Sequence, residues 1–360
     1  MSYKVFIYMV LIGSIFFAGC LNAVPDPMVT SPPTVTTGPT PTALKIDISP
    51  ITARSYPSVD GSTSTYPLQV TIACTILDVR CAWTEGDFFD TTRRITPENS
   101  LMASDEIEAI FKLNHSGTHG AYMNLIAKQA DLILVAREPS GDEMAAAETE
   151  RLDLHVLPVA LDGFVFLVHA DNPVQSLTLE QIRDIYTGKI TNWAEVGGLE
   201  AEIHTYQRNP NSGSQELMEK LVMRGEAMID SPDMILLSMM GPFSAIRDDP
   251  LGIGYSVYFY AANIFPEERV KMIAIEGIGP ASATIARRTY PLVTEVYAVL
   301  REDTPVGHAA RTLRDWLLTR EGQQAVAGSG YVGFEGDRLA PIGPIYQLEL
   351  RGADLDSDRT

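Results

Sequence analysis

The segment PVALDGFVFLV, residues 158–168, decides how the fold is organised. Its apolar continuation, Gly163–His169, has the length and composition of a buried strand. We place a domain boundary near Pro158–Asp162, where this run begins. A Gly- and Pro-rich stretch, Ile275–Ala283, would break regular structure and marks a return crossing. The chain is therefore predicted to insert a middle domain into an outer one.

Short apolar runs alternate with helical patterns on both sides of this segment. The runs that indicate strands are Leu132–Ala136, Gly163–His169, Ile253–Tyr260, Lys271–Ile275 and Val296–Leu300. The patterns that indicate helices are Leu68–Ala82, Ser104–Ile110, Ala121–Lys128, Leu179–Tyr186, Gln215–Met223 and Ala309–Thr319. Thr178 and Gln181 have the spacing of a capping box at the start of one helix. Such alternation predicts an α/β fold of sheets flanked by helices.

Two cysteines, Cys74 and Cys81, lie in the predicted helix Leu68–Ala82. Seven residues of helix separate two Cα atoms by roughly 10 Å along the axis. A disulfide needs its Cα atoms within about 7 Å. We therefore expect both cysteines to be buried apolar residues, unless the helix breaks between them.

The overall charge excludes some classes of function. The 360 residues hold 27 basic and 46 acidic side chains, a formal net charge of −19. A general nucleic-acid binder needs a basic surface that neutralises phosphates. Docking on anionic lipid by charge alone needs one as well. A small anion is not excluded, because local donors and one or two arginines decide such binding.

The N-terminus reads as an export signal, residues 1–19, in which Lys4 precedes a short apolar run. The run ends in small residues before Cys20, an arrangement typical of a lipidated first mature residue. Residues 20–44 are rich in Pro and Thr and predict an extended tether behind that anchor. An ordinary signal peptide or an uncleaved anchor is the alternative. The polar C-terminal residues 348–360 are expected to fray.

Three turns combine glycine with hydroxyl residues, and each precedes a predicted helix. They contain the residues Ser62, Thr63 and Ser64; Ser116, Gly117 and Thr118; and Ser212, Gly213 and Ser214. Backbone N–H groups at a helix start and nearby hydroxyls can hold an oxyanion without many charges. One such turn is most often a simple N-cap. Three of them favour convergence on one cleft.

Two charged positions add to this pattern. Arg208 precedes the third turn, where a guanidinium would clamp a tetrahedral oxyanion. Glu138 follows the apolar run Leu132–Ala136, at a strand end where α/β clefts form. A carboxylate there would accept a proton from hydrogen phosphate and favour it over sulfate. The alternative for Arg208 is an ordinary surface arginine, and the alternative for Glu138 is a solvated surface salt bridge.

Longer motifs resemble a known family. The block from Pro158 to Gly198 includes IYTGKITNW at residues 185–193 and resembles the PstS-like phosphate-binding proteins of ABC phosphate importers. Arg208 with Ser212-Gly213-Ser214, and DGSTST at residues 60–65, resemble that family's phosphate loops. Later matches extend the resemblance to Val332.

The resemblance implies a two-lobed, type II periplasmic binding protein fold with the ligand cleft at the hinge. Residues 45–160 and 280–347 would form the outer lobe, and residues 161–279 the inserted inner lobe. It implies an extracytoplasmic, membrane-anchored monomer that captures phosphate or a similar oxyanion for a membrane permease, without catalysis, cofactor or metal. The ligand donors would be Ser62, Thr63, Ser64, Ser116, Gly117, Thr118, Arg208, Ser212, Gly213 and Ser214, with Glu138 as the proton acceptor.

This chain departs from the family at some positions. Ser214 replaces a threonine, His119 stands where a small residue is expected, and Ala136-Arg137-Glu138 replaces the pattern that supplies the proton acceptor. A histidine near the anion would make affinity depend on pH. Other hypotheses stay open: an anion sensor without transport, a different oxyanion or organic phosphate, and, with less support, a zinc site at His115 and His119 or a serine hydrolase.

Overall fold

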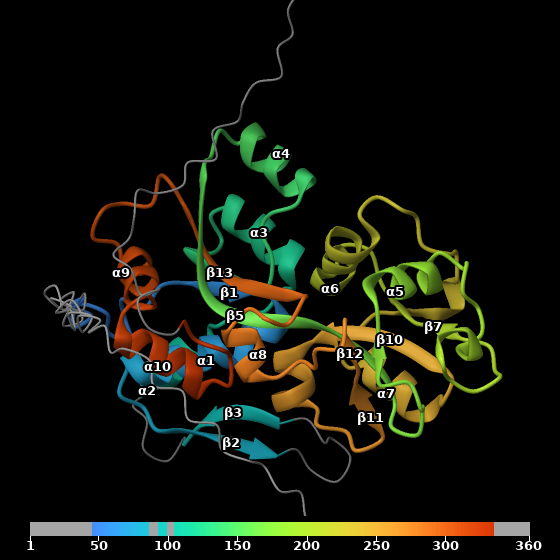
Figure 1. The fold of residues 1–360 in the computed structure, drawn as a ribbon. Helices are drawn as coiled ribbons and strands as arrows, with labels where there is room; N and C mark the ends of the chain where they lie inside the picture. The colour runs from blue at the N-terminus through green and yellow to red at the C-terminus, as the bar shows by residue number, and fades with distance from the viewer. Residues whose placement is uncertain (1–44, 86–92, 99–103, 335–360) are drawn as a thin grey trace, which may run out of the picture. The chain divides into compact units, whose positions relative to one another are not determined.

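The computed structural model of the chain describes residues 45–85, 93–98 and 104–334 (Figure 1). All of them belong to one compact unit, which begins at Ala43. The predicted export signal, Cys20, the whole tether and the C-terminal tail lie outside the described residues. Within the described ranges, no helix is both long and apolar enough to cross a membrane.

A mixed sheet forms the centre of this unit, in the order β1-β4-β13-β5-β10-β7, with β11 also paired to β5. β1 pairs with β4 in parallel, and β13 is antiparallel to both β4 and β5. β10 is antiparallel to β5 and parallel to β7. The strands are β1 (Val59–Gly61), β4 (Leu132–Val135), β5 (Leu154–His169), β7 (His204–Thr205), β10 (Gly252–Val257), β11 (Val270–Met272) and β13 (Val293–Arg301).

The long strand β5 joins the two halves of the sheet. Residues up to Gly163 pair with β13, and residues from Phe164 onward pair with β10. Every residue from Val159 to His169 is buried, which confirms the buried strand predicted there. We call the part built on β1, β4 and β13 the outer half, and the part built on β10, β7 and β11 the inner half. The change of partner in β5 makes this strand the connection between them.

Helices flank both halves of the sheet (Figure 1). They are α1 (Tyr66–Ile76), α2 (Ser104–Phe111), α3 (Thr118–Ile126), α4 (Gly141–Thr149), α5 (Leu179–Tyr186), α6 (Gly213–Leu217), α7 (Gly241–Asp248), α8 (Ser282–Ala286), α9 (Ala309–Trp316) and α10 (Arg320–Gly328). The predicted helix Leu179–Tyr186 has its predicted bounds. Its capping box is also confirmed, since Gln181 N donates to Thr178 Oγ1 at 3.0 Å and Thr178 N to Gln181 Oε1 at 2.9 Å. A π-helical turn, Met218–Met223, continues α6.

Three two-stranded ladders complete the part of the fold that the structure describes. They are β2 (Cys81–Glu85) with β3 (Arg93–Pro97), β6 (Ser176–Leu177) with β12 (Ala274–Ile275), and β8 (Gln207–Arg208) with β9 (Ile235–Leu236).

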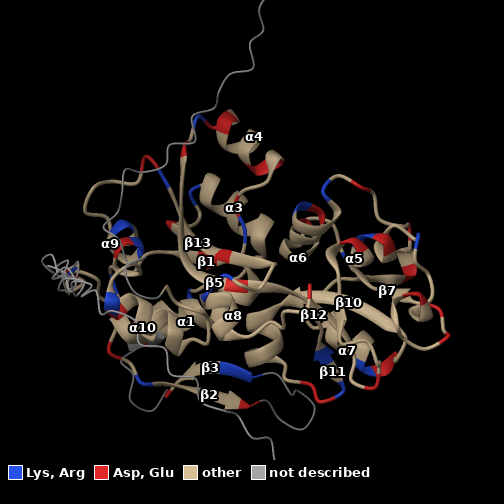
Figure 2. Cartoon of the chain, in the orientation of Figure 1, with Lys and Arg blue, Asp and Glu red and all other residues tan. Residues whose placement is uncertain are grey.

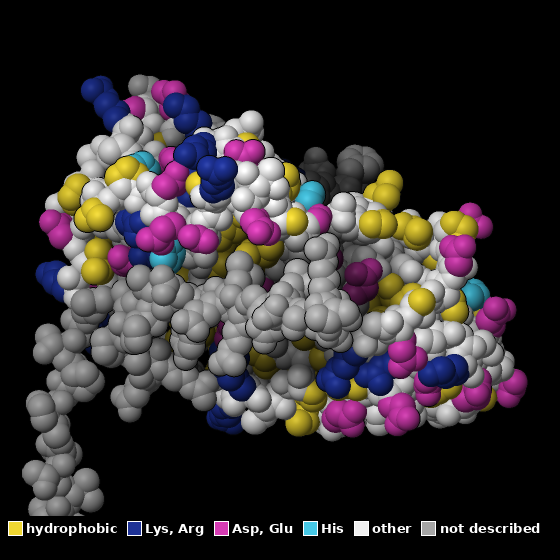
Figure 3. Space-filling model, turned by 90° about the horizontal axis from the view of Figure 1, so that it is seen from above, with side chains coloured by type: hydrophobic (Ala, Val, Ile, Leu, Met, Phe, Trp, Pro, Cys, Tyr) yellow, Lys and Arg dark blue, Asp and Glu magenta, His cyan; other side chains and the backbone are white. Residues whose placement is uncertain are grey.

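On the face that Figure 3 shows, Lys and Arg side chains lie among Asp and Glu side chains. This face therefore carries mixed charge.

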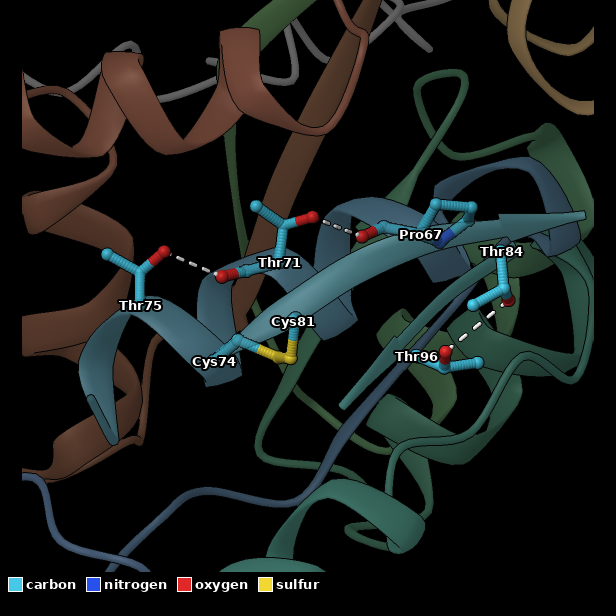
Figure 4. Close-up of a disulfide and its surroundings, with 7 residues drawn as sticks. All are labelled: Pro67, Thr71, Cys74, Thr75, Cys81, Thr84 and Thr96. Carbon is cyan, nitrogen blue, oxygen red and sulfur yellow. Dashed lines mark hydrogen bonds between the residues drawn. A yellow bond between two sulfur atoms is a disulfide. The ribbon is translucent and has the colours of Figure 1, made fainter. Parts of the chain in front are cut away.

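The predicted helix Leu68–Ala82 is wrong in its second half. The helix α1 ends at Ile76, and Asp78 takes a left-handed backbone conformation with φ 54°. The chain then turns back and enters β2 at Cys81. Cys74 and Cys81 consequently have Cα atoms 6.2 Å apart and form a disulfide (Figure 4). The expectation of two free buried cysteines fails because a strand, rather than a further helical turn, follows Asp78.

Candidate functional site

A cavity of about 690 Å³ brings the three hydroxyl-glycine turns together. Ten of the eleven predicted ligand-binding residues line it, namely Ser62, Thr63, Ser64, Ser116, Gly117, Thr118, Arg208, Ser212, Gly213 and Ser214. The first two turns extend from the outer half of the sheet and the third from the inner half. Residues from both sides of β5 therefore face one space.

The first turn is fixed by the neighbouring strand β4. Ser62 N donates to the carbonyl oxygen of Leu134 at 3.0 Å, and Ala136 N donates to Ser62 Oγ at 3.1 Å. A Cβ atom at Gly61 would lie 2.2 Å from the Leu134 oxygen, so only glycine allows this close approach. These contacts hold the turn against β4 at the end of β1.

The second turn is held by Asp60, which the sequence analysis did not single out. Asp60 is buried, and its Oδ1 accepts a hydrogen bond from Ser116 N at 2.9 Å. Its Oδ2 accepts from Asn124 Nδ2 at 2.7 Å, and Asn124 lies on α3. An acidic residue at a strand end directly before a glycine is the sequence signal that could have pointed to this role. Because Asp60 uses the Ser116 N–H, only the hydroxyl of Ser116 remains as a donor there.

The turns also contact one another. Ser62 Oγ and Thr118 Oγ1 lie 2.7 Å apart and share a hydrogen bond. A Cβ atom at Gly213 would lie 2.6 Å from Thr118 Oγ1, which places α6 directly against α3 (Figure 1). Ser212 caps α6, since its Oγ accepts from Gln215 N at 3.2 Å. The first backbone N–H groups of α3 have no acceptor within the helix, so they remain available to a ligand.

Arg208, at the end of β8, is a buried cation at the wall of this cavity. Its side chain donates from Nε to the Leu236 carbonyl oxygen at 3.0 Å and from Nη1 to Met239 Sδ at 3.3 Å. Among the ion pairs of the described residues, none involves Arg208. Burial lowers the pKa of Arg208. A buried positive charge without an anionic partner is costly, and an anion in the cavity would supply that partner.

Glu138 does not join the other predicted site residues. Its carboxylate lies 2.7 Å from Lys220 Nζ, in an exposed ion pair. It lines a neighbouring cavity together with Arg137 and Lys220, and it is absent from the lining of the cavity around Arg208. Lys220 attracts it from the inner half of the sheet. The structure therefore places the predicted proton acceptor outside the group of predicted donors.

The adjacent Arg137 is buried like Arg208 but is fully paired. It forms a bidentate pair with Glu143 of α4, with both Nη–Oε distances 2.8 Å. Its Nη2 also donates to Glu216 of α6 at 2.8 Å. Figure 2 shows acidic residues on α4 and charges of both signs beside α6. Burial raises the pKa of Glu216, and Arg137 opposes that shift.

His119 connects this cluster to the cavity wall. Its Nδ1 lies 3.1 Å from Glu143 Oε1, and the side chain lines the cavity with His115. His115 packs against the ring of Tyr66, with centroids 4.7 Å apart. Among the described residues, no three His, Cys, Asp or Glu side chains are grouped so that they could hold a metal ion.

Known proteins provide an independent comparison. In Staphylococcus epidermidis, a phosphate-binding protein PstS is 26% identical over 246 residues, which cover 65% of this chain and 73% of that protein. The phosphate-binding protein PstS of Bacillus subtilis is 25% identical over 198 residues, 53% of this chain and 62% of that protein. The resemblance stated from the sequence is thereby confirmed.

Solved structures share the fold. A Clostridium perfringens protein with bound phosphate superposes with a TM-score of 0.57 at 24% identity, covering 77% of this chain and 98% of that chain. An ABC-type phosphate transport receptor from Vibrio cholerae gives 0.54 at 21% identity, with coverages of 78% and 99%. The predicted α/β fold, of the two-lobed type II periplasmic binding protein class, is confirmed. A family model described as a PBP superfamily domain matches residues 101–321, and the chain therefore belongs to the PBP superfamily.

Proposed function

We propose that this chain is an extracytoplasmic solute-binding protein that captures inorganic phosphate, or a similar tetrahedral oxyanion, for an ABC importer. The observation that carries the proposal is the cavity around Arg208. Hydroxyl and backbone donors from three turns surround a buried guanidinium that has no acidic partner within the described residues. This is the arrangement that a desolvated oxyanion requires.

The relatives support phosphate as the ligand. The matched Staphylococcus and Bacillus proteins are named phosphate-binding proteins, and the Clostridium structure holds phosphate. The ten donors that line the cavity would bind the anion, and the two halves of the sheet would close on it about β5. The protein would carry out no bond chemistry, and it would need no cofactor.

The remaining features complete the proposal. Cys20 would carry a lipid, and residues 21–44 would tether the folded unit as a monomer to the outer face of the membrane. A permease in that membrane would receive the anion. The residue bounds of the two lobes, with 161–279 as the inserted lobe, belong to this proposal as well.

Titration calorimetry with phosphate tests the proposed function on the purified chain and its Arg208→Ala variant. The charge-assisted hydrogen bonds of an arginine contribute about 1.5–3 kcal/mol each, so we expect affinity to fall at least about tenfold. Arg247→Ala, a substitution of an arginine on α7 outside the cavity lining, serves as the matched control and should leave the affinity unchanged. An equal dissociation constant for wild type and Arg208→Ala would remove Arg208 from the site.

A further inference from the structure

We infer that this cavity selects tetrahedral oxyanions without a carboxylate acceptor, so that sulfate competes effectively with phosphate. The inference rests on the proposed function and specifies its ligand class. It concerns which chemical groups face the anion. A binding protein that rejects sulfate has to recognise the proton that phosphate keeps near neutral pH.

The lining of the cavity holds donors but no carboxylate. Its described residues include six serines, two threonines, two histidines and Arg208, and neither Asp nor Glu. Aspartate and glutamate are acceptor-only groups when ionised, whereas backbone N–H groups and Arg are donors only. A serine or threonine hydroxyl can rotate and do either. The wall therefore presents positive charge and adaptable dipoles to a ligand.

Four carboxylates that lie near this wall in the sequence are engaged elsewhere. Asp60 accepts from Ser116 N and Asn124, and Glu138 pairs with Lys220. Glu143 and Glu216 share Arg137. Moving any of them into the cavity would break an interaction with a charged group or a buried N–H. These contacts keep negative charge away from the space beside Arg208.

The chemistry of the two anions then decides the selectivity. Hydrogen phosphate has one O–H group, and sulfate at neutral pH has none. A carboxylate at the site would accept that proton and would repel the unprotonated oxygen of sulfate, which is discrimination by repulsion. Here a hydroxyl can accept the proton of phosphate, and the same hydroxyl can turn to donate to sulfate. No carboxylate in the described wall repels sulfate, and Asn209 Oδ1, a buried amide oxygen there without a partner, is an uncharged acceptor.

The histidines do not replace the missing carboxylate. His119 Nδ1 lies 3.1 Å from Glu143 Oε1, so it donates its proton to that carboxylate. His115 is likewise near an aromatic ring rather than an acid. Neither the neutral nor the protonated form of an imidazole carries negative charge, so a histidine does not repel sulfate as a carboxylate would.

Competition calorimetry on the full chain at neutral pH tests the inference with phosphate and sulfate as the two titrants. We expect the two dissociation constants to agree within about 30-fold, a difference of about 2 kcal/mol or less. If phosphate binds and sulfate is weaker by more than about 30-fold, the inference is wrong while the proposed function stands. If sulfate binds and phosphate does not, phosphate capture is wrong, whereas the inference of a wall without a carboxylate acceptor stands. If neither anion binds, both are overturned.

A pair of variants at Ala136 tests the same point by adding the missing group. Ala136 lines the cavity directly after β4, next to the hydroxyl of Ser62. Ala136→Asp should raise the preference for phosphate over sulfate at least about tenfold, because the new carboxylate repels sulfate. Ala136→Asn, of the same shape without the charge, should not change the ratio. An unchanged ratio in a folded Ala136→Asp variant would contradict the inference, and the wild-type ratio decides the matter should that variant fail to fold.

Discussion

Asp162 is a buried carboxyl at the point where β5 changes partners, and its replacement by asparagine should alter how stability depends on pH. Its exposed fraction is 2%. Oδ1 accepts hydrogen bonds from Gly163 N at 2.8 Å and Phe259 N at 2.9 Å, whereas Oδ2 has no partner within the described residues. Burial raises the pKa of Asp162 to about 7, against two backbone hydrogen bonds that lower it.

The size of the effect follows from this shift. The pKa of Asp162 moves from 3.8 in the unfolded chain to about 7 in the folded protein. Each pKa unit corresponds to about 1.4 kcal/mol, so ionising Asp162 costs the folded state roughly 4 kcal/mol. Because the folded pKa is raised, the contribution of this group is fully present below about pH 4 and is lost as pH rises through 7.

Asparagine keeps the oxygen that accepts both N–H groups and removes the charge. The free energy of unfolding of Asp162→Asn should therefore gain on wild type progressively between about pH 4 and 8, by a few kcal/mol in total. Urea unfolding of both proteins at several pH values measures this difference. Other carboxylates titrate in the same range, but they contribute equally to both proteins and cancel in the difference.

Asp233→Asn is the matched control, because Asp233 is an exposed aspartate. Its difference from wild type should stay flat with pH. The reasoning would be refuted if the difference between wild type and Asp162→Asn were also constant within about 0.5 kcal/mol across the range, because the carboxyl would then have an ordinary pKa in the folded protein.

Two further substitutions test the geometry of the cavity. Gly213→Ala should weaken phosphate binding at least about tenfold, since its Cβ would lie 2.6 Å from Thr118 Oγ1 and push α6 away from α3; calorimetry that gave an unchanged affinity would show that the two helices adjust. Glu138→Gln should leave the phosphate affinity within about twofold of wild type, because the carboxylate lies outside the cavity in an exposed pair with Lys220. A large loss in the same titration would restore Glu138 as the proton acceptor.

Features set by local chemistry were predictable from the sequence. The helix Leu179–Tyr186 has its predicted bounds because a capping box fixes its start within four residues. The hydroxyl-glycine turns were also identified locally, since serine, threonine and glycine favour helix starts whatever the tertiary fold. These turns meet at one cavity because of the order of the strands in the sheet. The alternation of strands and helices in the sequence predicts the fold class but does not give that order.

Features set by distant residues were not predictable in this way. The helix containing Cys74 was extended to residue 82 because the apolar pattern continues beyond its end at Ile76. Pairing of β2 with β3 competes with that pattern and draws Cys81 back toward Cys74. The position of Glu138 likewise depends on Lys220, 82 residues away in the chain. No local pattern reports such a partner.

Two of the buried arginines show which information the sequence alone does not carry. Arg137 and Arg208 are each 5% exposed, and both stand beside predicted anion-binding turns. Arg137 is neutralised by Glu143 and Glu216, so a ligand would have to displace a carboxylate to reach it. Within the described residues, the side chain of Arg208 donates only to a carbonyl oxygen and a sulfur, and its charge is left for the ligand. A buried charge that the protein leaves unpaired is stabilised only when an anion arrives, so the pairing state of each arginine, rather than its burial, distinguishes a binding residue from a structural one.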